Sequence, residues 1–251
     1  MSQPAALILA GSRGVPDPVA IAEGVVHKAL VEVAGEPLLA RVAAALRAAG
    51  LARIAVSADA PQVIALAEAL GCEVVAPAAG PSGSVRVAFD KLGAPLLVTT
   101  ADHALLRGQW VRDFIADSPA AADVTVLLAR REAVEAAAPG SRRTWLRFAD
   151  GSWSGCNLFL LATPRAVAAL ELWATVERER KRPWRLAARL GPATLLDYLR
   201  GRLGLGEAVA RLGRRVGIVS MVVAARDGRA AIDVDRPGDL AQVRSLVAQV
   251  A

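Results

Sequence analysis

Residues 5–14 read Ala-Ala-Leu-Ile-Leu-Ala-Gly-Ser-Arg-Gly, a short apolar run followed by a glycine turn. This pattern is typical of a buried strand, so we predict the first strand over residues 5–10. A glycine turn behind a strand lets backbone N–H groups approach a phosphate, and an arginine adds charge-assisted hydrogen bonds. An ordinary tight turn is the alternative, because the spacing is neither that of a Walker A loop nor that of a dinucleotide fingerprint. The candidate phosphate contacts are Ala10, Gly11, Ser12, Arg13 and Gly14.

Apolar strands and amphipathic helices alternate along the rest of the chain. Further strands are predicted over residues 53–57, 73–75, 95–100, 123–129, 154–160, 218–224 and 230–234. Helices are predicted over residues 37–49, 61–70 and 236–250, and one more runs from the turn at 77–84 through residue 92. Such alternation predicts a mostly parallel sheet with helices on both faces. Ligands bind such sheets beyond the carboxyl ends of the strands, where the glycine turn and Asp102 lie.

Length and composition limit the class of protein. With 251 residues, of which 54% are hydrophobic, the chain fits a single domain over 1–251. No apolar run reaches membrane-spanning length and the N-terminus lacks a signal-peptide pattern, so we expect a cytoplasmic protein. Cys72 and Cys156 are predicted to be core thiols. The net charge of +6 suits polyphosphates or acidic headgroups, whereas aromatic residues at 4% argue against nucleic acid as a partner.

The stretch 164–217 differs from the rest, because helical patterns dominate it. We expect a helical insertion within the domain. Arg and Lys are concentrated at residues 178–185, including Lys181 and Arg182, and Trp173 and Trp184 lie near them. A cationic, amphipathic surface of this kind fits an anionic acceptor, either a small molecule or a lipid-linked one at a membrane surface. A solvated helix whose charges are partly neutralised by glutamates is the alternative.

Two aspartates follow predicted strands and are candidate metal ligands. Asp102 ends the strand 95–100, and Asp235 follows the strand 230–234, with Asp233 as the second choice. The chain has only two histidines, His27 and His103, which excludes a histidine-rich metal site. Carboxylate ligands favour Mg²⁺ or Mn²⁺. The alternatives are a turn-forming Asp at 102 and a helix cap at Asp235, ahead of Pro237.

Residues 27–39 read His-Lys-Ala-Leu-Val-Glu-Val-Ala-Gly-Glu-Pro-Leu-Leu. With the Leu-Ala-Gly turn at 9–11, this segment resembles the nucleotidyltransferases related to molybdenum-cofactor guanylyltransferase (MobA-like) and the sugar- and alcohol-phosphate nucleotidylyltransferases. In these families a Lys and an apolar pair precede a Gly-x-Pro-Leu helix start. Here the spacer between Gly14 and Lys28 is longer, it contains Pro16-Asp17-Pro18, and His27 stands where Pro or Asp is common.

The resemblance implies a Rossmann-like, GT-A-like fold and a role for each motif. Lys28, with Arg13, would contact the triphosphate, and Asp102 and Asp235 would hold Mg²⁺ or Mn²⁺. The turn at residues 80–84 would lie against the nucleobase and ribose through Gly80, Ser82 and Ser84, although either serine could instead cap the following helix. Asn157 would face the acceptor or the ribose, with a buried turn asparagine as the alternative.

The implied reaction is transfer of a nucleoside monophosphate from an NTP, with CTP or GTP favoured, to a phosphorylated or hydroxyl acceptor, with release of pyrophosphate. Two other classes remain open. A GT-A-type glycosyltransferase would use a nucleotide-sugar, but it should carry an Asp-x-Asp motif where this chain has Asp102-His103-Ala104. A catalytically silent nucleotide-binding protein would release no pyrophosphate.

Overall fold

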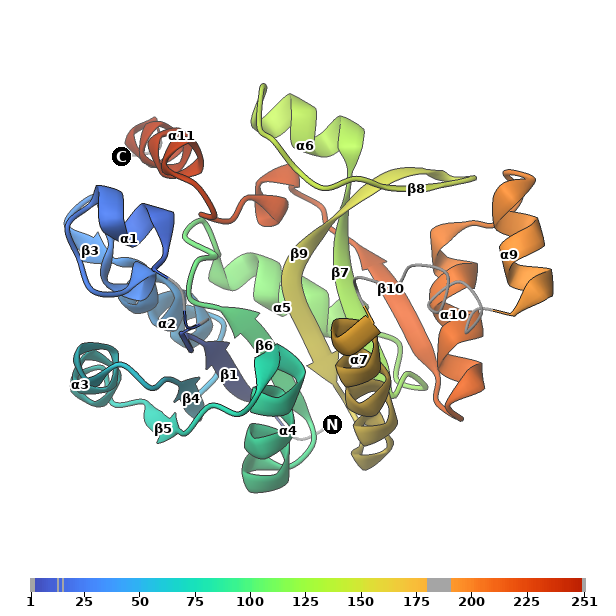
Figure 1. The fold of residues 1–251 in the computed structure, drawn as a ribbon, viewed down its shortest axis with the longest axis horizontal. Coiled ribbons are helices and arrows are strands. Elements are labelled where there is room, and N and C mark those ends of the chain that lie inside the picture. The colour runs from blue at the N-terminus through green and yellow to red at the C-terminus, as the bar shows by residue number, and fades with distance from the viewer. Residues whose placement is uncertain (1–2, 13, 15, 180–190, 250–251) are drawn as a thin grey trace.

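The computed structural model describes residues 3–12, 14, 16–179 and 191–249, and its centre is one mixed sheet between two layers of helices (Figure 1). The strands are paired in the order β10-β7-β9-β6-β1-β4-β5, and β8 pairs with the outer part of β9. All neighbours are parallel except those of β9, which runs antiparallel to β6, β7 and β8. The predicted α/β sandwich with a mostly parallel sheet is therefore confirmed.

The strands of this sheet are β1 (Ala5–Leu9), β4 (Ile54–Ser57), β5 (Glu73–Val75), β6 (Leu96–Thr100), β7 (Val124–Arg130), β8 (Leu146–Phe148), β9 (Gly151–Leu161) and β10 (Ser220–Ala224). A separate hairpin pairs β2 (Glu32–Val33) with β3 (Glu36–Pro37). The α-helices are α1 (Pro18–Ala22), α2 (Leu38–Ala48), α3 (Pro61–Ala69), α4 (Gly80–Leu92), α5 (Gly108–Asp117), α6 (Arg131–Ala137), α7 (Val167–Glu179), α9 (Pro192–Leu199), α10 (Leu205–Arg215) and α11 (Pro237–Ala248). Short 3₁₀ helices are η1 (Lys28–Leu30), η2 (Pro164–Ala166) and η3 (Gly228–Ala231).

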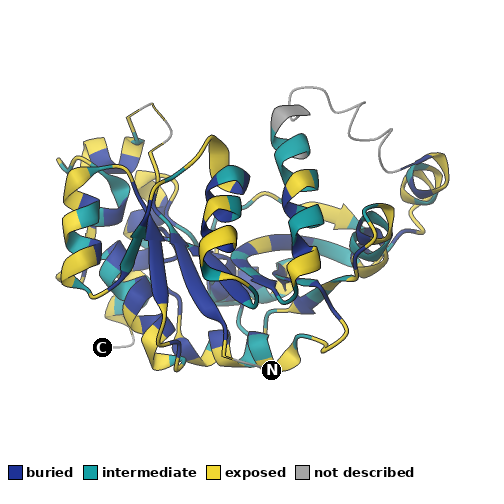
Figure 2. Ribbon diagram, turned by 90° about the horizontal axis from the view of Figure 1, so that it is seen from below, coloured by how far each residue is buried: buried dark blue, intermediate teal, exposed yellow. Residues whose placement is uncertain are grey.

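The side chains of β1 show how the sheet is covered on both faces. Ala6 and Ile8 point to the core that includes α2 and α5, whereas Ala5 and Leu7 point to the core beneath α4 and α7. Alternate side chains of a strand face opposite sides, so an uninterrupted apolar run is what a strand between two helical layers requires. Figure 2 shows the result, with buried strands between helices whose outer surfaces are exposed. Cys72 and Cys156 are both free and buried, as predicted.

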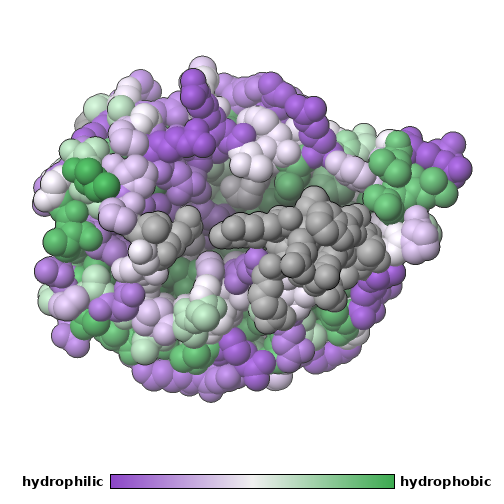
Figure 3. All heavy atoms as spheres, viewed as in Figure 1, coloured by the Kyte–Doolittle hydropathy of each residue, from purple (hydrophilic) through white to green (hydrophobic). Residues whose placement is uncertain are grey.

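The helical pattern predicted after residue 163 is present in the described residues. Helix α7 packs against α4 in front of the sheet, and α10 packs against β10 (Figure 1). Helix α9 carries exposed apolar side chains, Leu196, Tyr198 and Leu199, and Figure 3 shows hydrophobic residues gathered at that end of the molecule. No helix in the described part of the chain is long and apolar enough to cross a membrane.

One local prediction was wrong. Residues 230–234 do not form a strand, because residues 228–231 form η3, which is packed against α6. The helix caps that were the alternative explanations for Ser82, Ser84 and Asp235 are not formed. Helix α4 begins after Ala79 without a side-chain cap, and the serines of its first turn lie inside the helix. Helix α11 begins after Arg236, not Asp235, and the carboxylate of Asp239 accepts the backbone N–H groups of both residues.

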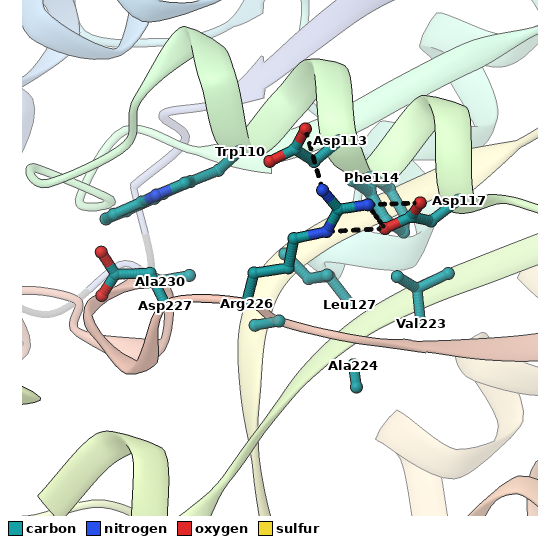
Figure 4. A pocket seen from close by; sticks show the side chains of 11 residues that line it. Trp110, Asp113, Phe114, Asp117, Leu127, Val223, Ala224, Arg226, Asp227 and Ala230 are labelled. Carbon is teal, nitrogen blue, oxygen red and sulfur yellow. Dashed lines mark hydrogen bonds and ion pairs between the residues drawn. The ribbon is translucent and has the colours of Figure 1, made fainter. Parts of the chain in front are cut away.

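Ion pairs connect the carboxyl end of β10 to α5. Arg226, just beyond β10, lies 2.7 Å from Asp117 and 3.6 Å from Asp113, as Figure 4 shows beside a small surface pocket. None of the residues that line this pocket belongs to the predicted site. The network ties the edge strand β10 to α5.

Candidate active site

The glycine turn lies at the carboxyl end of β1. The Ala10 N–H donates to the Ser57 carbonyl at the end of β4, and Gly11 packs beside Pro77, where an added Cβ would make an ordinary contact of 3.4 Å with the proline ring. The backbone N–H and hydroxyl of Ser12 both donate to Asp59 Oδ1, at 3.0 and 2.9 Å. Gly14 has a φ of +72°, a conformation that glycine adopts without strain. Arg13 lies outside the described residues.

Lys28 enters the site at the start of η1. The ring of His27 caps this short helix, because its Nδ1 accepts the N–H of Ala29 over 3.0 Å. This cap gives His27 a structural role at the start of η1. With the backbone fixed in this way, the largely buried Lys28 side chain extends toward the end of β6.

Asp102 meets the Lys28 ammonium at the carboxyl end of β6. The distance from Lys28 Nζ to Asp102 Oδ2 is 2.6 Å, and the hydroxyl of Thr100 donates to the other carboxylate oxygen over 2.5 Å. Burial alone would raise the pKa of Asp102, but the charge and hydrogen bond of Lys28 outweigh it, so the pKa is lowered. Burial likewise opposes the charge on Lys28, and Asp102 reverses this, so the pKa of Lys28 is raised. The pair is therefore ionised at neutral pH.

Asp235 joins the same site from the other end of the chain. Its Oδ1 lies 3.3 Å from Lys28 Nζ, and its side chain is 54% exposed, so it faces incoming ligands more openly than Asp102. A backbone hydrogen bond from Val234 N–H to the Asp102 carbonyl, 3.1 Å long, joins the two segments. The two aspartates predicted from sequence are therefore adjacent in space.

Asp233, the second choice for the metal site, is bound to protein groups. Arg143 forms a close ion pair with one carboxylate oxygen, and the Asn157 amide donates to the other over 2.7 Å. The pKa of Asp233 is raised, first by burial and then by the nearby charge of Asp102. Arg143 also reaches Asp239 at 3.0 Å. Sequence analysis missed Arg143, which lies about ninety residues from its partners and belongs to no recognisable motif.

Residues 80–84, predicted as a turn ahead of the helix, form the first turn of α4 itself and are closed by contacts within the protein. The Ser84 hydroxyl is buried and is bonded to the backbone of Ala78 and Gly80. Ser82 donates its hydroxyl and its backbone N–H to the carboxylate of Glu177 on α7, over 2.6 and 3.3 Å. The Glu177 contact was also missed. Lys181 and Arg182 lie outside the described residues.

The arrangement fits a divalent cation held by hard oxygen ligands. Mg²⁺ is commonly held by one or two carboxylates together with substrate phosphates, and Asp102 and Asp235 form such a pair. Within the described residues, no three His, Cys, Asp or Glu side chains are grouped to bind a metal by themselves. A cation at this site would therefore need further oxygen ligands, such as those of water or a bound phosphate.

Comparison with known proteins identifies the family. A model described as the MobA-like NTP transferase domain matches residues 6–190. A hypothetical transferase from Thermus thermophilus is 32% identical, with a TM-score of 0.81 over 95% of this chain and 99% of that one. No curated protein is similar enough in sequence to count as a match.

More distant solved structures share the fold. A CMP:2-keto-3-deoxy-manno-octonic acid synthetase complexed with CTP is 21% identical, with a TM-score of 0.58 and full coverage of both chains. A 2-C-methyl-D-erythritol 4-phosphate cytidylyltransferase, also from Thermus thermophilus, is 15% identical, with a TM-score of 0.55 over 98% of this chain and 99% of that one. From the family match and this site, we conclude that the chain belongs to the MobA-like NTP transferases and is a nucleotidyltransferase.

Proposed function

We propose that this nucleotidyltransferase moves a nucleoside monophosphate from an NTP to an anionic acceptor and releases pyrophosphate, with Mg²⁺ or Mn²⁺ held by Asp102 and Asp235. The observation that carries the proposal is the position of Lys28 Nζ, 2.6 Å from Asp102 and 3.3 Å from Asp235. A cation and two carboxylates thus meet beyond the carboxyl end of β6, beside the glycine turn. We favour CTP or GTP, and the two distant structures named for CTP or cytidylyl transfer support CTP.

The reaction needs alignment and charge neutralisation rather than a protein nucleophile. An oxygen of the acceptor forms a bond to the α-phosphorus, and the bond from that phosphorus to the bridging oxygen breaks, so pyrophosphate leaves with the electron pair. A bound divalent cation supplies charge stabilisation for the triphosphate. Lys28, with Arg13, offsets charge on the phosphates. The N–H groups of Ala10 and Ser12 are bonded to Ser57 and Asp59, so the N–H groups of Gly11 and Gly14 would donate to the phosphates first.

The nucleoside would lie against the first turn of α4 at Gly80, Ser82 and Ser84. Small residues there let a base and a ribose approach the backbone closely. Gly80 has a φ of +76°, which favours glycine, and an added Cβ would lie 2.8 Å from a Glu177 carboxylate oxygen, which would have to move. Binding through Ser82 therefore involves Glu177 as well.

The acceptor would bind between Asn157 and the cationic stretch that contains Lys181 and Arg182. Asn157 points its amide at Asp233, so any contact with the acceptor would be made through its remaining amide oxygen. Neutralising Lys181 and Arg182 together should raise the acceptor KM and leave the NTP KM nearly unchanged. Salt-sensitive sedimentation with anionic vesicles would indicate a lipid-linked acceptor and peripheral membrane contact, and unchanged kinetics without sedimentation would show that the stretch is scaffold.

The deciding experiment measures pyrophosphate release. The protein is incubated with Mg²⁺, each of the four NTPs and a panel of phosphorylated acceptors, with Asp102→Asn as the inactive control. Release that depends on both one NTP and one acceptor supports the proposal. Release of a nucleoside diphosphate from a nucleotide-sugar would instead identify a glycosyltransferase. NTP binding without any product would identify a silent binding protein.

A further inference from the structure

The Lys28 ammonium lies at the point where the proposed metal would bind. Its nitrogen is 2.6 Å from Asp102 Oδ2 and 3.3 Å from Asp235 Oδ1. The other oxygen of Asp102 accepts the hydroxyl of Thr100, so both oxygens of this carboxylate have partners. Mg²⁺ binds carboxylate oxygens at about 2.0–2.1 Å. A divalent cation shared by Asp102 and Asp235 therefore competes with the ammonium for the same oxygens.

A third carboxylate lies beside the same ammonium. Asp17 Oδ2 is 3.8 Å from Lys28 Nζ. The other oxygen of Asp17 caps α1, where it accepts the N–H groups of Val19 and Ala20 over 2.9 and 3.2 Å. Because the cap fixes this side chain, its second oxygen stays directed at Lys28. Asp17 belongs to the Pro16-Asp17-Pro18 spacer between the glycine turn and Lys28.

The charges of this cluster match a divalent cation. The carboxylates of Asp17, Asp102 and Asp235 all lie within 4 Å of the Lys28 ammonium. Three negative charges and one positive charge leave this cluster with a net charge of −2. An incoming Mg²⁺ neutralises the cluster. If the ammonium stayed between Asp102 and Asp235, it would repel that cation at close range.

We propose that Lys28 and the divalent cation exchange places, and that Asp17 is the positioning residue that retains the displaced ammonium. The cation binds between Asp102 and Asp235, and the ammonium turns toward Asp17 and the glycine turn, where the triphosphate meets it. This exchange rests on the proposed function for the identity of the metal ligands. It assigns a role to a residue, Asp17, that the motifs do not include.

Binding of Mn²⁺ without nucleotide, followed by electron paramagnetic resonance, tests the exchange separately from activity. Lys28→Met removes the competing cation and should tighten Mn²⁺ binding by about tenfold or more, as expected for loss of a close like charge. Asp17→Asn should weaken Mn²⁺ binding several-fold, because the ammonium loses its alternative partner. Asparagine also caps helices well, so this variant keeps the cap of α1 and removes only the charge. Lys91→Met, on the surface beside Glu73, is the control and should bind Mn²⁺ as the wild type does.

Three results would overturn the exchange: Mn²⁺ affinity that is unchanged or weakened in Lys28→Met, wild-type affinity in Asp17→Asn, or no Mn²⁺ binding by either the wild type or Lys28→Met. Circular dichroism of each variant checks that it is folded. Failure of the proposed function is distinguishable. If Mn²⁺ affinities shift as expected but no NTP yields pyrophosphate, the exchange stands and the assigned reaction is wrong. If pyrophosphate is released but the affinities do not shift, the reaction stands and the exchange is wrong.

Discussion

The side-chain amide of Asn157 donates a hydrogen bond to Asp233 Oδ2 over 2.7 Å and so joins the middle of β9 to the segment that carries Asp235. Asn157 has a φ of +47°, and the pairing of β7 with β9 shifts register between Val126 and Leu128, where Asn157 interrupts the ladder. With Arg143 on the other oxygen, Asp233 is held from two sides. The position of Asp235 therefore depends on Asn157 and Arg143, which act on it through Asp233.

Arg143→Ala should destabilise the fold and reduce turnover. Its guanidinium is almost fully buried and compensates Asp233 and Asp239, and loss of one partner of a buried ion pair costs about 3–5 kcal/mol. Urea unfolding measures the change in free energy of unfolding. The neighbouring Arg142 is exposed, so Arg142→Ala is the matched control and should change stability by less than about 0.5 kcal/mol. Equal changes in the free energy of unfolding for the two substitutions would show that the ion pairs of Arg143 do not stabilise the fold.

Asp102→Asn and Asp235→Asn should each reduce kcat by about a hundredfold or more, the scale seen when one electrostatic partner of a transition state is removed. Thermal melting should show both variants folded, with a larger loss of stability for Asp102, which is bonded to Lys28 in the interior. Asp90→Asn, on the surface of α4, is the control. Near-normal activity with Mg²⁺ in both variants would mean that the metal site lies elsewhere.

Glu177→Gln should lower the KM for the NTP several-fold. In the structure the Glu177 carboxylate accepts both the hydroxyl and the N–H of Ser82, the groups we assign to the nucleoside. The neutral amide binds these donors less strongly than the carboxylate, so the nucleotide displaces it more readily. Steady-state kinetics with varied NTP measure the effect, and the acceptor KM should not change.

Glu171→Gln is the control for this substitution, because Glu171 lies on the same helix but is exposed and pairs only loosely with Arg86, at 3.8 Å. An NTP KM that is unchanged or raised in Glu177→Gln would show that the Ser82–Glu177 contact only stabilises the fold and that Ser82 does not bind the nucleotide.

His103 should make the protein sensitive to mild acid. Burial lowers the pKa of His103 from 6.5 to about 4, although Asp102 opposes the shift. Between these values the unfolded chain binds a proton that the folded chain excludes, so stability is complete above about pH 6.5 and is lost as the pH falls toward 4. The difference corresponds to roughly 3 kcal/mol.

Urea unfolding at pH 7 and pH 4.5 measures this loss of stability. His103→Met should reduce it, whereas His27→Gln should retain the part that comes from His103. An equal loss in the wild type and His103→Met would show that another group is responsible.

The sequence predicts most of the fold because its strands are apolar on both faces and its helices end at glycines. The strand predicted over 73–75 agrees with β5 to the residue, whereas β10 begins two residues later than expected and β9 three residues earlier. The strand predicted at 230–234 fails because an apolar run alone does not distinguish a strand from a buried 3₁₀ turn.

Asp102, Asp235 and Lys28 could also be predicted from their motifs. In the structure, the carboxylates of both aspartates lie within 4 Å of the Lys28 ammonium. Arg143, Asp59 and Glu177 could not be predicted. Each acts through a partner at least 47 residues away, at 90, 47 and 95 residues respectively. A single arginine or carboxylate outside a motif carries no local signal of such a pairing.

The strand order also governs how the chain can fold while it is being synthesised. β1, β4, β5 and β6 are neighbours in the sheet and are all complete by residue 100, so they can pair as soon as they are made. β7 comes next but pairs only with β9 and β10, which are made later. As the chain emerges from the ribosome, β7 must therefore wait beside an open edge of β6 until β9 inserts between them. That interval exposes the unpaired apolar strand β7 and the open edge of β6, and it is the stage at which a nascent chain of this design most needs a chaperone.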